Sequence, residues 1–326
     1  MSNTVRSRQM SGRSRGTHLV LPSRLAPRTK PFESVSFASN KSVNGEATNY
    51  YSNSAIGNPD RPNARFSTEL KGHAAPIEKV AFNPVKQAEL CSVSNDGTVK
   101  LWDVRNNLCV GEFKGLGEAF TLAWAPDGSS LIVGNKTDKL FIIQPGQSTP
   151  VASYQQSTQT NQIAFCWSGK KAFVTTGDGK TRILSYPDLK PLLLNEFDEP
   201  PSEFKLSGHT ASCLTTALHP AARYLATGGS ESLISLWDTK DWICQRTLAG
   251  MTGPVRSLSF SFDGSYISAG SEDGKGVRIW HTESGDEVHV IDTKDTASVV
   301  AWAPLHYRLA FNDHGSLHIA SVSERR

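Results

Sequence analysis

The chain has 326 residues, is 38% hydrophobic and 20% charged, and has a formal net charge of +3, a composition typical of one large or two ordinary globular domains. No apolar run reaches the roughly 18 residues of a membrane-spanning helix, and no signal-peptide pattern opens the chain. The five cysteines (Cys91, Cys109, Cys166, Cys213, Cys244) are far apart in sequence. This spacing excludes a disulfide framework and a zinc site, and we expect buried free thiols.

Residues 1–30 contain seven basic residues and no acidic one, so the rest of the chain is slightly acidic. We predict a disordered basic tail over residues 1–16 and a folded domain over residues 17–326. The tail is either a solvated segment, or a nuclear-targeting or weak RNA-contacting segment that acts through Arg6, Arg8, Arg13 and Arg15. A mitochondrial transit peptide fits less well, since the segment makes a poor amphipathic helix.

Residues 17–25, THLVLPSRL, contain an isolated apolar stretch that ends at Pro22. His18, Leu19, Val20 and Leu21 are predicted to form a strand. A strand needs a partner for its backbone groups, and no hairpin turn follows to supply one. Its partner must therefore lie elsewhere in the chain.

From Leu70 onward one pattern recurs: Gly-His, a strand, a second strand, a tight turn with Asp, and a third strand that ends in Trp-Asp. The clearest copies are residues 70–104, 206–239 and 254–282, and weaker ones begin near residues 120, 162 and 298. The residue that closes each first strand falls at Phe82, Trp124, Trp167, Leu218, Phe260 and Trp302. The intervals are 42, 43, 51, 42 and 42 residues, and the long one contains an acidic, Pro-rich insertion.

The same spacing extended backward reaches Phe37 and Gly57, but the residues between them are polar and do not alternate. A period of 40–45 residues with Gly-His and Trp-Asp signatures is typical of a propeller of four-stranded blades. The chain thus resembles the WD40 repeat family. We expect an all-β, seven-bladed WD40 β-propeller whose first blade is degenerate.

The resemblance implies a structural network of His, Ser or Thr, Asp and Trp in regular blades. In the first clear repeat these would be His73, Ser92, Asp96 and Trp102. The next offers His209, Thr227 and Trp237 but has Glu231 at the Asp position, and the third keeps Asp273 and Trp280 but has Gly250-Met251 in place of Gly-His. These residues are interpreted as scaffold, because buried polar groups need internal partners.

Motifs for catalysis or cofactor binding do not fit their required context. Gly177–Ile183, GDGKTRI, has Val174 where a phosphate-binding loop needs glycine, and no helix is predicted after it. Gly270–Gly276, GSEDGKG, is interpreted as a turn with one extra residue that makes a bulge. The nine histidines show no metal-ligand spacing. We therefore expect no enzyme activity and no cofactor.

Several segments are similar to the THO complex subunit 3 family, above all LSYPDLKP from Leu184 to Pro191, which is not part of the generic repeat pattern. This resemblance implies a nuclear scaffold that couples transcription to mRNA packaging and export. Its partners would be other THO subunits, a DEAD-box helicase and an export adaptor, with RNA contacted weakly or indirectly and no membrane. The alternative is a substrate receptor of a cullin-RING ubiquitin ligase, since Trp102–Arg105 matches the WDxR motif of such propellers.

Partner contacts are expected at one rim of the blades, at positions that flank the first strand and precede the turn Asp. The predicted rim residues are Pro76, Glu78, Asn95, Ser212, Leu214, Ser230, Pro254, Arg256 and Glu272.

The last repeat has three predicted strands and no fourth. Propellers commonly complete such a blade with a strand from the N-terminus, which also removes an exposed edge. We therefore predict that His18–Leu21 pairs with the strand around Leu317–Ile319, and that residues 1–16 are dispensable for folding.

Overall fold

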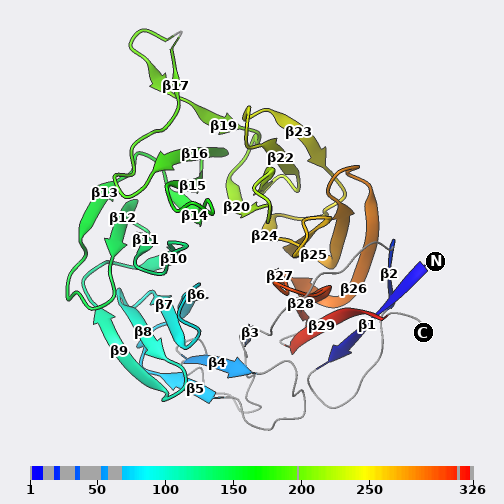
Figure 1. The fold of residues 1–326 in the computed structure, drawn as a ribbon, viewed down its shortest axis with the longest axis horizontal. Coiled ribbons are helices and arrows are strands. Elements are labelled where there is room, and N and C mark those ends of the chain that lie inside the picture. Colours follow the sequence, from blue (N-terminus) through cyan, green and yellow to red (C-terminus); the bar gives the residue numbers. More distant parts are fainter. Residues whose placement is uncertain are drawn as a thin grey trace. The chain divides into compact units, whose positions relative to one another are not determined.

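The structure is a computed structural model that describes residues 2–9, 18–22, 34–36, 53–57, 68–196, 198–313 and 316–323. The regular elements over these residues are β-strands (Figure 1). No helix in this part of the chain is long and apolar enough to span a membrane. The strands fall into two compact units, which we call the middle unit (residues 68–207, with β4) and the C-terminal unit (residues 208–323, with β1 and β2).

The middle unit contains three antiparallel blades of four strands each. The first is β6 (Ile77–Phe82), β7 (Glu89–Ser94), β8 (Val99–Asp103) and β9 (Leu108–Phe113). The second is β10 (Ala119–Trp124), β11 (Leu131–Asn135), β12 (Lys139–Ile143) and β13 (Ala152–Gln155). The third is β14 (Thr160–Phe165), β15 (Lys171–Thr176), β16 (Lys180–Ser185) and β19 (Lys205–Ser207), and a hairpin of β17 (Leu194–Asn195) and β18 (Ser202–Glu203) is inserted before its last strand.

The C-terminal unit contains three further blades. One is β20 (Cys213–Leu218), β21 (Tyr224–Gly229), β22 (Ile234–Asp238) and β23 (Cys244–Leu248). The next is β24 (Val255–Phe260), β25 (Tyr266–His281) and β26 (Glu287–Ala297). The last is built on β27 (Val300–Trp302), β28 (Arg308–Asp313) and β29 (Ser316–Ser323).

Burial along each blade explains why the sequence has this pattern. The second strands β7, β11, β15 and β21 are buried along almost their whole length, whereas the outer strands β9 and β23 are largely exposed. A strand that is covered on both faces reads as a continuous apolar run rather than as an alternation. Neighbouring blades supply that cover: Val99 and Phe113 of one blade pack in one cluster with Leu122 and Trp124 of the next.

The structure corrects one of the residues used to count the repeats. Phe165, not Trp167, closes the first strand of the third blade, because Phe165 pairs with Ala172 as Trp124 pairs with Leu131. Phe165 is buried, while Trp167 lies in the following turn and is 58% exposed. The sequence pattern favours Trp167 because tryptophan closes the first strand in other repeats, but the pairing register shows that Phe165 holds this position.

The number of blades also differs from the prediction. The described residues form six blades and not seven. The segment predicted as a degenerate first blade contributes β3 (Ser34–Ser36) and β4 (Asn53–Gly57), which form a three-stranded sheet with β5 (Thr68–Lys71). The polar sequence between β3 and β4 lacks the apolar alternation that a packed blade requires.

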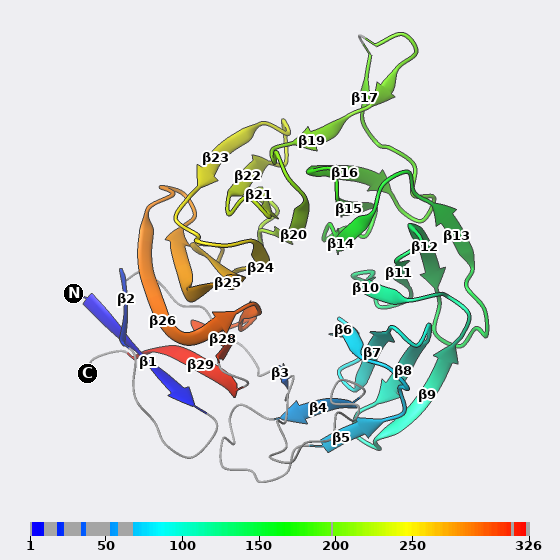
Figure 2. The ribbon, with the colours of Figure 1, turned by 180° about the vertical axis from the view of Figure 1, so that it is seen from behind.

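The last blade does take an outer strand from the N-terminal region, but not the predicted one. β1 (Ser2–Gln9) pairs with β29, with Arg8 opposite Ile319 and Gln9 opposite His318. β2 (His18–Pro22) pairs with β1 instead, as a fifth strand. Figures 1 and 2 both show β1 between β2 and β29. The predicted pairing of His18–Leu21 with β29 is therefore wrong, and Ser2–Gln9 is a strand where a disordered tail was expected.

The expectation of buried cysteines is correct for only two of the five. Cys91 and Cys213 are buried, Cys166 is half-buried, and Cys109 and Cys244 are exposed, all five as free thiols. Cys109 and Cys244 lie on the outer strands β9 and β23, which are largely exposed. The division of the chain at residue 17 stays a prediction.

The pairing of β1 with β29 makes a test possible. A chain that lacks residues 2–9 should melt at least about 5 °C below the full chain, because β29 loses the partner for its outer backbone groups. Replacement of His18–Pro22 by a Gly-Ser segment of equal length should cost less, and circular dichroism measures both. If only the replacement lowers the melting temperature, the assignment of β1 is wrong.

Candidate functional site

A network of hydrogen bonds in the first blade joins His73, Ser92, Asp96 and Trp102. The indole Nε1 of Trp102 donates to Ser92 Oγ at 2.8 Å, and Ser92 Oγ lies 2.7 Å from His73 Nε2. His73 Nδ1 lies 2.9 Å from Asp96 Oδ2. With Asp96 ionised, the donors run in one direction, from indole to hydroxyl to imidazole to carboxylate.

Burial and hydrogen bonding set the charges of this network. Burial lowers the pKa of His73, against the raising effect of Asp96, so the imidazole is neutral near pH 7. Burial opposes ionisation of Asp96, but bonds from the Thr98 side chain, the backbone N–H of Ala74 and His73 outweigh it and lower the pKa of Asp96 to about 2.

The blade of β20–β23 repeats the network with a longer acid. Trp237 Nε1 donates to Thr227 Oγ1 at 3.0 Å, and Thr227 Oγ1 lies 2.8 Å from His209 Nε2. His209 Nδ1 bonds Glu231 Oε1, so the glutamate stands in for the aspartate. The other oxygen, Glu231 Oε2, is buried without a hydrogen-bond partner in the part of the chain that the structure describes.

The third regular repeat does not form this network. Trp280 is 1% exposed and belongs to the core cluster that also holds Met251. Asp273 is exposed, and its backbone N–H donates to Ser271 Oγ at 3.3 Å. With Met251 in place of histidine, no hydrogen bond within the described residues links Asp273 to the Trp280 indole. The pairing of β25 also shifts register on both sides of Lys275.

The predicted rim residues of each blade come together at one end of that blade. Asn95 bonds Glu78 through its side chain, and its backbone N–H donates to the Pro76 carbonyl at 3.1 Å. The backbone N–H of Ser230 donates to the Ser212 carbonyl at 2.9 Å. Arg256 Nε lies 2.8 Å from Glu272 Oε2. Leu214 and Pro254 are half-buried beside them.

The first strands share a feature that identifies further rim positions. In five blades the pairing of the first two strands skips one residue near the start, namely Glu78, Phe120, Asn161, Leu214 and Arg256. Such bulges re-aim a side chain, and they recur beside functional sites. Sequence reasoning found three of these residues and missed Phe120 and Asn161. A count of four residues back from Trp124 would have found Phe120, whereas the same count reaches Asn161 only from Phe165, the residue that closes this strand in the structure.

One Gly-rich motif lies in a hairpin turn, whereas Gly270–Gly276 lies within β25 (Tyr266–His281) and not in the predicted turn. Gly177–Gly179 forms the tight turn between β15 and β16, so no helix follows to present a phosphate site. Arg105, from the WDxR match, is exposed, and its backbone N–H donates to Asp103 Oδ1 at 2.9 Å. Of the predicted tail residues, Arg6 and Arg8 lie in β1, whereas Arg13 and Arg15 lie outside the described residues.

Comparison with known proteins agrees with this geometry. The family model "WD domain, G-beta repeat" matches residues 64–103, 201–238 and 242–281, which are the three regular repeats. The solved β-propeller domain of Myceliophteria thermophila Cps50 (Swd1) superimposes with a TM-score of 0.69 at 15% identity, covering 83% of this chain and 94% of that one. The fold and the networks therefore define a WD40 β-propeller.

Similar proteins show to which family of WD40-repeat proteins the chain belongs. THO complex subunit 3 of Arabidopsis thaliana is 35% identical over 243 residues, which cover 74% of this chain and 73% of that protein. WD repeat-containing protein AAC3 of Dictyostelium discoideum is 31% identical over 76% of this chain, but the match spans only 51% of that protein. The chain belongs to the THO complex subunit 3 family of WD40-repeat proteins.

The buried hydroxyl of Ser92 should be important for stability. Ser92→Ala leaves the Trp102 indole N–H and His73 Nε2 without their partner, at about 1–3 kcal/mol each in the free energy of unfolding. Ser153→Ala, on the exposed side of β13, is the control and should change it by less than about 0.5 kcal/mol. Urea denaturation measures both, and equal losses would contradict the network.

The low pKa of Asp96 predicts a pH dependence. The folded carboxyl has a pKa of about 2, below its ordinary 3.8, so its stabilising contribution is complete above about pH 4 and is lost as the pH falls toward 2. The destabilisation by Asp96→Asn should therefore be largest near neutral pH and shrink below about pH 4. A destabilisation that is constant down to about pH 2.5 would refute this.

Proposed function

We propose that this chain is a non-enzymatic scaffold subunit of a THO complex, and that it acts in the nucleus to couple transcription to mRNA packaging and export. The observation that carries the proposal is the 35% identity to THO complex subunit 3 over 73% of that protein. Its proposed partners are other THO subunits, a DEAD-box helicase and an export adaptor.

The hydrogen bonding of the polar side chains supports a role as a scaffold. His73 and Asp96, which could serve acid–base chemistry elsewhere, are bonded to each other and to Ser92 and Thr98 inside one blade. Rigid blades with loops at both ends can bind several proteins with little reorganisation. The bulge residues Glu78, Phe120 and Asn161 of the middle unit, and Leu214 and Arg256 of the C-terminal unit, are the proposed contact points.

RNA contact is proposed to be secondary. The basic residues Arg6, Arg8, Arg13 and Arg15 would supply a salt-sensitive attraction to phosphates without sequence preference. The ligase-receptor alternative has less support: Arg105 is exposed, but the relatives described above favour the THO assignment.

The rim is tested with a triple substitution, Glu78→Ala with Arg256→Ala and Glu272→Ala. It should reduce capture of purified THO subunits by about tenfold or more, since rim charges contribute to partner selection, and leave the melting temperature unchanged within about 2 °C.

The matched control is Arg223→Ala with Glu283→Ala, which removes another exposed ion pair, of 2.7 Å, from the C-terminal unit. The control should capture THO subunits like the unaltered chain. A folded triple variant that also captures them normally would show that the rim is not the contact surface.

A further inference from the structure

The connection before the last strand of the third blade is longer than a blade needs. The corresponding connections are residues 104–107 in the first blade and residues 239–243 in the blade of β20–β23, whereas residues 186–204 separate β16 from β19. Much of the extra length forms the hairpin of β17 and β18, which projects from the edge of the third blade (Figures 1 and 2). We call the described residues from 192 to 204 the hairpin arm. The packing between blades does not account for it.

Contacts at the base hold the hairpin arm in place. Arg182 Nε donates to Glu203 Oε1 at 2.6 Å, and the two side chains are only 13% and 16% exposed. Arg182 Nη1 also bonds the buried side chain of Gln156, which directly follows β13 of the second blade. A two-stranded hairpin is at best marginally stable by itself. The shielded ion pair therefore stabilises the arm against the blade, and an arm that is already ordered loses little entropy when it binds a partner.

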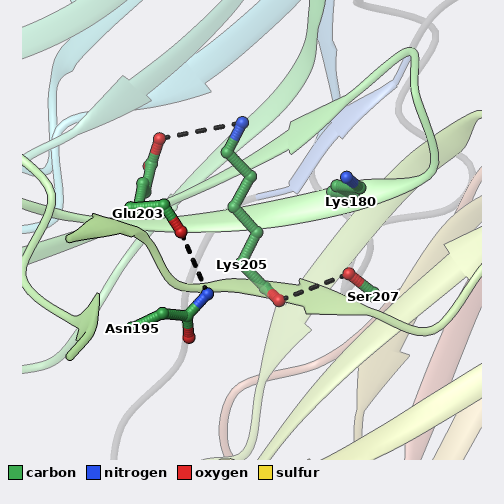
Figure 3. Close-up of a pocket in the computed structure, with 6 residues that line it drawn as sticks. Lys180, Asn195, Glu203, Lys205 and Ser207 are labelled. Carbon is green, nitrogen blue, oxygen red and sulfur yellow. Dashed lines mark hydrogen bonds and ion pairs between the residues drawn. The ribbon is translucent and has the colours of Figure 1, made fainter. Parts of the chain in front are cut away.

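The pocket at the base of the arm contains both signs of charge. Its lining includes Lys180, Lys205 and Glu203, and Glu203 Oε2 lies 3.8 Å from Lys205 Nζ (Figure 3). Such a mixture selects neither an anion nor a cation. We therefore interpret the base as the attachment of the arm.

The outer part of the arm carries negative charge only. Residues 192–204 include four acidic residues and no Lys, Arg or His. One of the four is bonded at the base, and the other three, Glu196, Asp198 and Glu199, are exposed. In the part of the chain that the structure describes, no cation lies within ion-pair distance of these three carboxylates. Their unbalanced charge repels nucleic acid phosphates and favours a basic surface.

The arm also exposes apolar side chains beside these acids. Leu192 is 40% exposed and Leu194 is 55% exposed, on the chain that enters the hairpin. Leu194 pairs with Glu203 in the two-stranded sheet, so its backbone position is fixed by the base contacts. A leucine side chain in water lacks the stabilisation that burial gives. A protein partner with an apolar surface would supply that burial.

The geometry points to the hairpin arm as a docking element for a protein partner that presents Lys and Arg side chains around an apolar surface. Leu192 and Leu194 pack on the apolar part, and the carboxylates of Glu196, Asp198 and Glu199 pair with the basic residues at its border. The acids supply the selectivity and the leucines supply the buried area.

This inference deepens the proposed scaffold function and rests on it, because the partner is then another subunit of the same assembly. The docking element is also separate from the rim. The rim residues lie at the bulges of the first strands, whereas the arm lies beside the outer strand of its blade.

The test measures binding of the full chain to the other THO subunits, purified together without this chain, by biolayer interferometry at about 50 and about 300 mM salt. Glu196→Lys with Glu199→Lys should weaken binding by about tenfold or more at the lower salt, because like charges then face each other. Salt should weaken binding of the unaltered chain more than binding of this variant. Leu192→Ser with Leu194→Ser should also weaken binding by about tenfold or more, since apolar burial is lost.

Two control variants make the same chemical changes elsewhere. Asp241→Lys with Asp286→Lys reverses two exposed acids of the C-terminal unit, and Val85→Ser with Val151→Ser removes two exposed apolar side chains of the middle unit. Both controls should bind within about twofold of the unaltered chain. All four variants should melt within about 2 °C of it, since the changed side chains are exposed.

The outcomes separate this inference from the scaffold function. If the unaltered chain binds the THO subunits and either arm variant binds like its control, the docking element is rejected and the scaffold function stands. Tighter binding of the lysine variant would also overturn the inference, because it would show that the partner surface is acidic. If the unaltered chain does not bind the THO subunits, the scaffold function is rejected, and the docking element with it.

Discussion

Each blade of this protein is a small sheet with two apolar faces, and only a neighbouring blade can cover them. The second strands show the constraint most clearly, since β7, β11, β15 and β21 are buried almost throughout. A polar group that enters such a layer must find its partner inside it. In the first blade, a series of hydrogen bonds connects Trp102, Ser92, His73 and Asp96. In the blade of β20–β23, a corresponding series connects Trp237, Thr227, His209 and Glu231.

Because of this constraint, the packed layers of the blades form a scaffold, and irregular features are confined to the edges of the blades. His73, Asp96, His209 and Glu231 are held in internal networks, where they stabilise the blades. The departures from a regular ladder lie at the bulges of the first strands and at the insertion before β19. A bulge interrupts the ladder at one residue only, and a hairpin adds to a strand end, so neither disturbs the packed layers.

Much of the blade architecture and of the polar networks could be predicted from the sequence, because packing between blades and the residue preferences of tight turns determine the repeat. The Gly-His, Asp and Trp spacing placed His73, Ser92, Asp96 and Trp102 correctly within one network. The position of Trp167 could not be read from residue type, because the ladder register and not the aromatic ring decides which residue closes a strand. Asn161 was missed for the same reason, whereas Phe120 could have been found by counting back from Trp124.

The N-terminal strand and the pairing of β19 could not be predicted from the sequence, for different reasons. An outer strand pairs through its backbone groups, so it does not need apolar side chains. The polar segment Ser2–Gln9 therefore pairs with β29, whereas the apolar pattern predicts His18–Leu21 for this position. The register that sets Lys205 of β19 opposite Arg182 of β16 could not be predicted either, because a polar, Pro-rich insertion separates the two strands in sequence.

The central claim is that the chain is a scaffold subunit of a THO complex. Native affinity purification of the tagged full chain from nuclear extract, with mass-spectrometric identification of what co-purifies, tests it most directly. We expect the other THO subunits in near-equal amounts with the chain, retained after nuclease treatment. Recovery of a cullin-RING ligase adaptor in their place, or loss of every THO subunit on nuclease treatment, would contradict the claim.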